Sequence, residues 1–167
     1  LAKYDSLGNP LWLKRGGGST TYDDDANGVA VDKWGNVFIT GFFSGTAGFD
    51  NLSVTSAGGE DIFIAKYDND GNILWLKRAG GNGSSGDRGR GIAVDTSGNC
   101  YVTGSFSGNA SFGSIPAISA GSSDIFLAKY NSTGSTIWVS SAGGTTGDYG
   151  QAVAVDEGGN SYVTGFY

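Results

Sequence analysis

One segment of this chain occurs three times, end to end, at a constant spacing. The tetrapeptide Leu-Ala-Lys-Tyr at positions 1–4 returns as Ile-Ala-Lys-Tyr at 64–67 and again as Leu-Ala-Lys-Tyr at 127–130, a step of 63 residues each time. The same step separates three tryptophans, which are Trp12, Trp75 and Trp138. A repeat of this length, with strand-like and turn-like stretches inside it, indicates a stacked or radial array of β-sheets. The repetition therefore constrains the architecture more tightly than the function.

Composition favours many short strands joined by tight turns. The 167 residues include 31 glycines and 2 prolines, and 13% of them are aromatic. A chain of this length can bury a core of its own, and such an aromatic content is unlike that of a disordered chain. No segment carries a sustained helical period, so the sequence predicts an all-β protein.

Charge and reactive residues argue against several classes of function. The net charge of −6 and the pI near 4.3 speak against binding to a nucleic-acid backbone. Histidine, the commonest general base and transition-metal ligand, is absent. Cys100 is the single cysteine, which excludes an intrachain disulfide or a cysteine zinc site. It fills the slot of Val37 and Ser161, so we expect an ordinary strand residue. No apolar run reaches the roughly 18 residues of a membrane span.

Aligning the copies predicts four strands per repeat. The predicted strands cover 28–32, 37–41, 62–67 and 73–78, with counterparts at 91–95, 100–104, 125–130 and 136–141, at 152–156 and 161–165, and at 1–4 and 10–15. The units are then a partial unit over 1–27, complete units over 28–90 and 91–151, and a partial unit over 152–167. Together they hold three sheets' worth of strands.

Two kinds of connection alternate along the chain. Five of the six short connections follow D-x-x-G-N, in which the aspartate accepts backbone N–H bonds and the glycine supplies a positive φ. The long connections cover 16–27, 79–90 and 142–151, together with 44–61 and 107–124. We expect antiparallel hairpins with their turns at one end of the sheets. The long loops then gather at the other end, where a binding surface is expected.

The repeat resembles a known family. The motif D-I-F-I-A-K-Y-D-x-x-G-N-x-x-W spans 61–75, then Gly80-Gly81 follow, and D-x-G-x-x-I-A-V-D-x-x-G-N-x-Y-V-T-G-x-F-x-G spans 87–108. This pattern is similar to the SBBP-type β-propeller repeat of large secreted or cell-surface bacterial proteins, and the similarity covers essentially the whole chain. It implies blades of four antiparallel strands, an extracellular or cell-surface location, and a role in interaction or as a scaffold. It implies no catalytic residues.

Three residues break the repeat symmetry as candidate binding residues. Trp34 occupies a turn where the other copies carry Ser97 and Gly158. Such an aromatic contacts a sugar or a partner's pocket, or packs on its own blade or a neighbouring domain. Arg88 and Arg90 form a basic spot at the long-loop end, which contacts a partner or pairs with nearby acidic residues.

One segment matches part of a calcium-loop pattern. Residues 23–28 read D-x-D-x-N-G, which makes Asp23, Asp25 and Asn27 candidate calcium ligands. The distant glutamate of a complete EF-hand loop is missing, so we favour a solvated acidic loop and expect no cofactor. The acidic turn at 68–72 is interpreted as a hairpin turn, because its counterpart at 5–9 lacks the second carboxylate.

Other charged residues recur in every repeat and are expected to be structural. Asp24, Asp87 and Asp148 are predicted to cap turns, whereas Lys3, Lys66 and Lys129 are predicted to lie along the sheet with their amines in water.

The favoured function is a non-enzymatic extracellular module that binds protein or glycan at the long-loop face, or serves as a scaffold. The alternative is a propeller-fold enzyme of the glycosidase or lyase type that uses long-loop carboxylates. The absence of histidine and of asymmetric carboxylate clusters counts against it.

The chain opens abruptly at a strand and shows no signal peptide. We expect a piece of a larger propeller or, as the alternative, one half of a two-chain ring of six blades.

Overall fold

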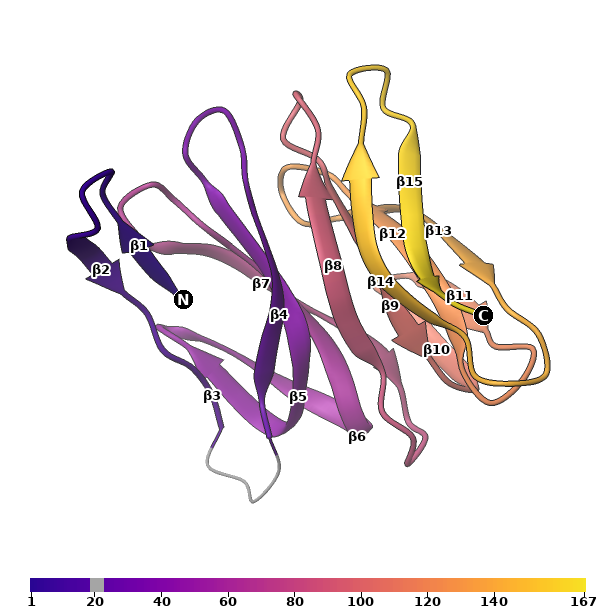
Figure 1. Ribbon diagram of the computed structural model, residues 1–167. Helices are drawn as coiled ribbons and strands as arrows, with labels where there is room; N and C mark the ends of the chain where they lie inside the picture. The colour runs from indigo at the N-terminus through magenta and orange to yellow at the C-terminus, as the bar shows by residue number, and fades with distance from the viewer. Residues whose placement is uncertain (19–22) are drawn as a thin grey trace.

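The computed structural model describes residues 1–18 and 23–167 (Figure 1). Every regular element among them is a β-strand, which confirms the all-β prediction. The strands are β1 (Ala2–Tyr4), β2 (Pro10–Leu13), β3 (Gly16–Gly17), β4 (Asp25–Val31), β5 (Val37–Phe49), β6 (Leu52–Tyr67), β7 (Ile73–Gly81), β8 (Arg88–Val94), β9 (Cys100–Phe106), β10 (Asn109–Phe112), β11 (Ile115–Ile118), β12 (Asp124–Tyr130), β13 (Thr136–Ala142), β14 (Tyr149–Val155) and β15 (Ser161–Phe166). Among the described residues, no helix is long and apolar enough to cross a membrane.

Two complete antiparallel sheets of four strands form the centre of the molecule. One sheet contains β4, β5, β6 and β7 in that order, and the next contains β8, β9, β12 and β13. The pair β1–β2 lies before the first sheet and the pair β14–β15 after the second, so that the four units stand side by side in sequence order (Figure 1). Four antiparallel strands in chain order are the arrangement of a propeller blade.

The core lies between the sheets. The larger cluster of buried side chains joins the two complete sheets and includes Phe38, Ile62, Val102 and Phe126. A second cluster includes Ile39, Phe63 and Tyr67, and Leu1 and Trp12 of the first half-sheet pack against it. The first strands β4, β8 and β14 pack side by side.

The short turns adopt the structure that D-x-x-G-N predicts. In one of them, Asp68 Oδ1 accepts the backbone N–H groups of Asp70 and Asn72 at 2.9 and 2.8 Å. Gly71 has a φ of 84°, and the glycines at the same position of the other five turns have φ between 79° and 83°. The side-chain amide of Asn72 is the main reason that the pKa of Asp68 is lowered from its ordinary value. These turns lie together at the upper end of the sheets in Figure 1.

The connections over 44–61 and 107–124 were predicted as loops, and this was wrong. β5 continues to Phe49 and pairs with β6 from Leu52, and β10 and β11 form the corresponding hairpin in the next repeat. The sequence here is rich in Gly, Ser and Thr, which hides the alternation of buried Ala47 and Phe49 with exposed Thr46 and Gly48. Because of these extensions the described chain has more strands than predicted.

Each extension also reaches the preceding unit. β10 pairs with the end of β7, and β5 pairs in the same register with β3, which continues the chain after β2. The hairpins therefore link neighbouring sheets at the end opposite the short turns.

Candidate functional site

The candidate binding residues lie at two opposite ends of the sheets. Arg88 and Arg90 begin β8 at the end of the long connections, whereas Trp34 lies in the turn between β4 and β5. In Figure 1 that turn is at the upper end, and the β7–β8 connection is at the lower end. A single ligand at one end therefore cannot contact both groups.

Arg88 is held by two groups of the preceding sheet. Its Nε donates a hydrogen bond to the carboxylate of Glu60 in β6. Its guanidinium carbon lies 4.6 Å from the centre of the Phe42 ring, which is a cation–π contact. The side chain nevertheless remains 42% exposed. Arg88 therefore pairs with an acidic residue of the long connections while one part still faces the solvent.

Arg90 contacts a different neighbour. It is the bulge residue of β8, where the register with β9 shifts between Gly89 and Gly91. Its guanidinium carbon lies 5.6 Å from the centre of the Tyr149 ring in β14, and its buried Nε has no hydrogen-bond partner among the described residues. The two arginines thus contact opposite neighbouring units, Arg88 the preceding one and Arg90 the following one.

The acidic segment is partly engaged in structural contacts. Asp24 accepts the backbone N–H groups of Gly18 and Ser44 at 2.6 and 3.1 Å, as the prediction of a capping aspartate requires. Asn27 donates its side-chain amide to the carbonyl of Gly89 at 3.0 Å. Asp23 and Asp25 are exposed. Within 1–18 and 23–167, no group of three or more acidic, His or Cys side chains is placed to hold a metal. Calcium at this segment stays a hypothesis.

A buried pair of carboxylates was missed by sequence reasoning. Asp87 is 2% exposed and accepts the backbone N–H groups of Gly81 and Ser107. Asp61 is fully buried, and within the part of the chain that the structure describes its Oδ1 has no hydrogen-bond partner. A Cβ atom on Gly80 would lie 2.6 Å from Asp61 Oδ1 and 2.9 Å from Asp87 Oδ2, so the two acids converge on this glycine.

The pKa of Asp87 is raised to about 6. Burial is the main cause, and the charge of Asp61 raises the pKa further. The two backbone hydrogen bonds and the nearby Arg78, which is ion-paired with Asp61, act in the opposite direction. The same arrangement recurs in the next sheet, where Asp124 and Asp148 converge on Gly143. Because the arrangement recurs in both complete sheets, we interpret it as structural.

A groove opens beside Arg88 at the long-connection end. Its volume is about 420 Å³, and it is lined by Ser44, Gly58, Gly59, Glu60, Ser84, Gly86 and Arg88. Backbone hydrogen bonds hold its two sides together, from Gly59 N to Gly83 O and from Asp87 N to Glu60 O, both 2.8 Å long. The groove thus presents main-chain groups of glycines, two hydroxyls and one ion pair. These groups suit an extended polar ligand.

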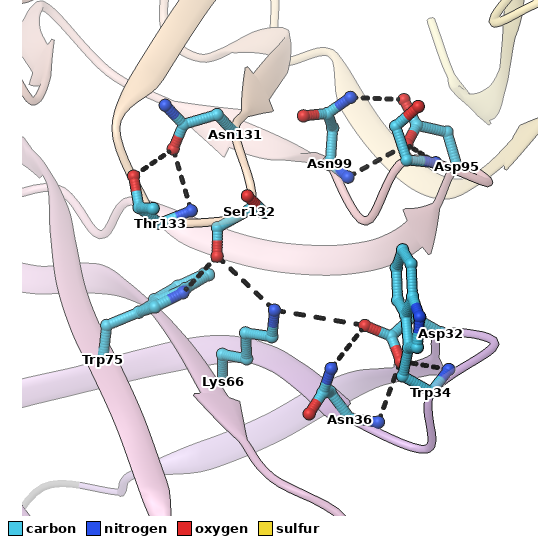
Figure 2. A network of polar contacts seen from close by, with 11 residues as sticks. Asp32, Trp34, Asn36, Lys66, Trp75, Asp95, Asn99, Asn131, Ser132 and Thr133 are labelled. Atoms are coloured by element: carbon cyan, nitrogen blue, oxygen red, sulfur yellow. Dashed lines mark hydrogen bonds and ion pairs between the residues drawn. The ribbon is translucent and has the colours of Figure 1, made fainter.

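At the opposite end, one lysine and one tryptophan hold the next sheet. Lys66 and Trp75 both donate to the carbonyl of Ser132, over 3.4 and 3.1 Å, as Figure 2 shows. Lys66 Nζ also lies 4.0 Å from Asp32 and 4.8 Å from the centre of the Phe38 ring. The prediction that this amine lies in water is therefore wrong, because Lys66 is only 6% exposed. We call this arrangement the turn clasp.

The turn clasp is repeated one unit earlier. Lys3 and Trp12 donate to the carbonyl of Asn69, over 3.0 and 3.1 Å. The acceptor lies 66 residues after the lysine in both cases. Repeated contacts across a sheet boundary explain why the lysine and tryptophan recur at a step of one repeat.

Trp34 is a half-exposed residue at the same end. It is 56% exposed, Lys33 Nζ lies 4.5 Å from the ring centre, and a Cβ atom on Gly98 would lie 3.1 Å from the ring. The indole therefore rests by one edge on the turn of the next sheet. One edge of the ring is therefore packed on its own protein, and the rest of the ring is accessible to a partner.

Replacing Trp34 by alanine is expected to lower the free energy of unfolding by no more than about 1 kcal/mol, since most of the ring is already in water. Urea unfolding of both proteins measures this difference. A loss of several kcal/mol would instead make Trp34 a packing residue.

Cys100 lies in the core. It is 0% exposed, and burial raises the pKa of its thiol to about 12. A thiol that stays protonated is no nucleophile, in keeping with the expected strand residue.

Part of the repeat matches a known family. Residues 74–109 match the family model of the SBBP beta-propeller repeat. The matched segment runs from β7 through β8 and β9 to the start of β10. The resemblance to SBBP repeats is thus confirmed over this stretch, which includes the D-x-x-G-N turn of the second complete sheet.

One curated relative is similar over a larger part of the chain. It is an uncharacterized WD repeat-containing protein of Acanthamoeba polyphaga mimivirus, 31% identical over 118 residues. The alignment covers 64% of this chain and 8% of the viral protein. WD repeats are blades of four strands, so this likeness agrees with the sheets described above.

Proposed function

We propose that this chain is a non-enzymatic interaction module of a secreted or cell-surface protein, and that it binds an extended protein segment in the groove beside Arg88. The groove itself is the observation that carries the proposal. It lies at the long-connection end and combines glycine main chain with the ion pair of Glu60 and Arg88. Similarity to a WD repeat-containing protein and to SBBP repeats supports an interaction role. The extracellular location rests on the resemblance to SBBP repeats alone.

The groove favours protein over glycan as the ligand. Main-chain groups and hydroxyls line it, and no aromatic side chain belongs to its described lining. Extended peptides bind through main-chain hydrogen bonds, with pockets or charges adding specificity. A sugar ring commonly stacks on an aromatic face, and the half-exposed Trp34 lies at the other end of the sheets. Glycan binding near Trp34 is therefore the second candidate.

An enzyme is the less supported alternative. The carboxylates near the groove either pair with an arginine, as Glu60 does, or accept buried backbone N–H groups, as Asp87 does. Hydrolysis of glycosides typically needs two carboxyl groups that flank one open site. The proposed module works without a cofactor.

A blocking variant tests the groove. A peptide library displayed on phage is selected against the chain, and the selected peptides are measured by calorimetry. Ser84→Trp, which fills the groove, should weaken binding at least about tenfold, a loss of about 1.4 kcal/mol. Thr145→Trp is the matched control, because it places the same ring in the β13–β14 connection outside the groove. Equal binding by both variants would reject the groove.

A glycan array run in parallel separates the second candidate. Glycan binding that Trp34→Ala abolishes and Ser84→Trp leaves intact would move the site to the turn end. Release of sugar from a glycan by the wild-type chain would support the enzyme instead.

A further inference from the structure

We propose that a pocket between the two complete sheets binds a carboxylate group of a ligand through Lys77. The pocket has a volume of about 270 Å³. It lies where β7 meets the β10–β11 turn and the β12–β13 turn of the next sheet, and all of its lining residues fall between positions 77 and 136. None of these residues lines the groove beside Arg88, so this inference is independent of the proposed function.

Both charged side chains that line the pocket are cations, and one of them is unpaired. Arg78 forms an ion pair with Asp61. Lys77 has no ion pair among the described residues. No carboxylate belongs to the described lining. The amine of Lys77 therefore lines a pocket that supplies no negative charge to it.

The position of Lys77 is fixed by the following turn. A Cβ atom on Gly134 would lie 2.7 Å from Lys77 Cε, so the lysine stem lies directly over this glycine. One repeat earlier, Lys14 lies over Gly71 in the same way, at 3.1 Å from the corresponding Cβ position. The two lysines thus occupy equivalent places at successive sheet boundaries, and their surroundings can be compared directly.

The preceding boundary already contains a carboxylate at this place. Lys14 Nζ lies 3.3 Å from the carboxylate of Asp50, which belongs to the β5–β6 turn. The residue that corresponds to Asp50 in the β10–β11 turn is Gly113. Both residues have a left-handed backbone, with φ of 50° and 64°, so the two turns have the same shape here. The pocket beside Lys77 therefore lacks one carboxylate that its counterpart supplies from within the chain.

Hydroxyl groups complete the pocket as hydrogen-bond donors. Three of them belong to the lining, those of Ser114, Ser135 and Thr136. Tyr130 also lines the pocket and is 2% exposed. Among the described residues its hydroxyl has no hydrogen-bond partner of normal geometry, although Thr136 is near. Burial is the main reason that the pKa of Tyr130 is raised, so this hydroxyl keeps its proton and remains a donor.

The donors define the class of ligand. One unpaired amine and several hydroxyls suit a group with a single negative charge and two acceptor oxygens, because charge-assisted hydrogen bonds to a carboxylate are the strong ones. A buried hydroxyl without a partner is costly, and an oxygen of the ligand would satisfy it. The carboxylate can belong to a small organic acid or to an acidic side chain of a peptide, and the experiments below distinguish these two sources.

Titration with acetate is the first test. Amide chemical shifts of the isotope-labelled chain are followed by NMR while acetate replaces chloride at constant ionic strength. We expect saturable changes at residues 113–114 and 134–136. The equivalent residues 50–51 and 71–73 should not respond, because Asp50 holds that place. Acetamide, a neutral molecule of the same size, is the control. Equal changes with acetamide, changes that do not saturate, or saturable changes confined to other residues overturn the proposal.

Two lysine variants test the role of the amine. Lys77→Gln should raise the dissociation constant of acetate at least about fivefold, since it removes the charge that the carboxylate pairs with. Lys14→Gln is the matched control, because it makes the same change of charge at the lysine that Asp50 already occupies. We expect it to leave acetate binding unchanged. Equal dissociation constants for both variants reject Lys77 as the binding residue.

Gly113→Asp tests the place of the carboxylate. It gives the second turn the residue that the first turn carries, and Asp50 shows that an aspartate adopts this φ. A Cβ atom there would lie 2.8 Å from Thr136 Oγ1, which can rotate away. The new carboxylate should pair with Lys77 and abolish acetate binding, and the amide spectrum verifies the fold. Undiminished binding by the folded variant contradicts the proposal.

The source of the carboxylate is tested with a second probe. N-acetylaspartate amide, which presents the carboxylate as a peptide side chain does, is titrated in the same way as acetate. A lower dissociation constant for this probe than for acetate assigns the pocket to an acidic side chain of a protein partner. An equal or higher one assigns it to a small organic acid. Binding of neither probe rejects the pocket as a carboxylate site.

Discussion

Replacing Trp75 by alanine is expected to lower the free energy of unfolding by about 3–5 kcal/mol. Trp75 is 8% exposed, meets Phe38 edge-to-face at 5.9 Å, and joins the two complete sheets through the carbonyl of Ser132. Its removal leaves a cavity at the sheet boundary and takes away one donor to the carbonyl. Guanidinium unfolding followed by fluorescence and circular dichroism measures the loss.

Two further variants divide this effect into its parts. Trp75→Phe keeps a ring but loses the N–H donor, so we expect a smaller loss of about 1–2 kcal/mol. Trp138→Ala alters the same slot of the next sheet, where the ring meets Tyr101 at 6.0 Å but no following turn is described. Trp138→Ala should therefore lower the free energy of unfolding clearly less than Trp75→Ala does. Equal losses would mean that contacts inside one sheet, and not the turn clasp, hold Trp75.

The sequence predicts best what is encoded locally. The D-x-x-G-N turns need only five adjacent residues, and every bond that the pattern predicts at Asp68 is present. Alternation and repetition likewise place the strands within a few residues. The extended hairpins escaped prediction because small polar residues serve equally well in loops and in edge strands.

The sequence of one repeat does not predict which residues contact each other across neighbouring sheets. Lys66 has the flanking residues of an ordinary surface lysine, and its acceptor lies 66 residues away. The convergence of Asp61 and Asp87 is of the same kind, because each aspartate recurs as a separate position of the repeat. The 63-residue step marks these residues as structural but carries no information on which of them meet. Comparing the repeats also singled out Arg88 and Arg90, which differ between the copies. Their contacts, in contrast, were known only once the structure was available.

The ionisation of Asp87 predicts a pH-dependent stability. Its pKa is about 6 in the folded chain and 3.8 for an ordinary aspartate, a difference worth about 3 kcal/mol. Because the folded value is the higher one, this contribution is fully present below about pH 4 and is lost as the pH rises through about 6. Asp87→Asn does not titrate. The unfolding free energy of the variant should therefore gain about 3 kcal/mol relative to wild type between about pH 3.5 and 8.

The asparagine in Asp87→Asn also loses one hydrogen-bond acceptor, which changes the stability by the same amount at every pH. The change with pH of the difference in unfolding free energy between variant and wild type therefore reports the titration of Asp87 alone. Asp68→Asn is the matched control, because the third repeat already carries Asn131 in that slot. The pKa of Asp68 is lowered by its turn, so its stabilisation is present at neutral pH and disappears in acid. The difference between Asp68→Asn and wild type should accordingly change in the opposite direction. The prediction is contradicted if the difference in unfolding free energy between Asp87→Asn and wild type does not change with pH. The pKa of Asp87 would then be the same in the folded and the unfolded chain, and burial near Asp61 would not disfavour its ionised form.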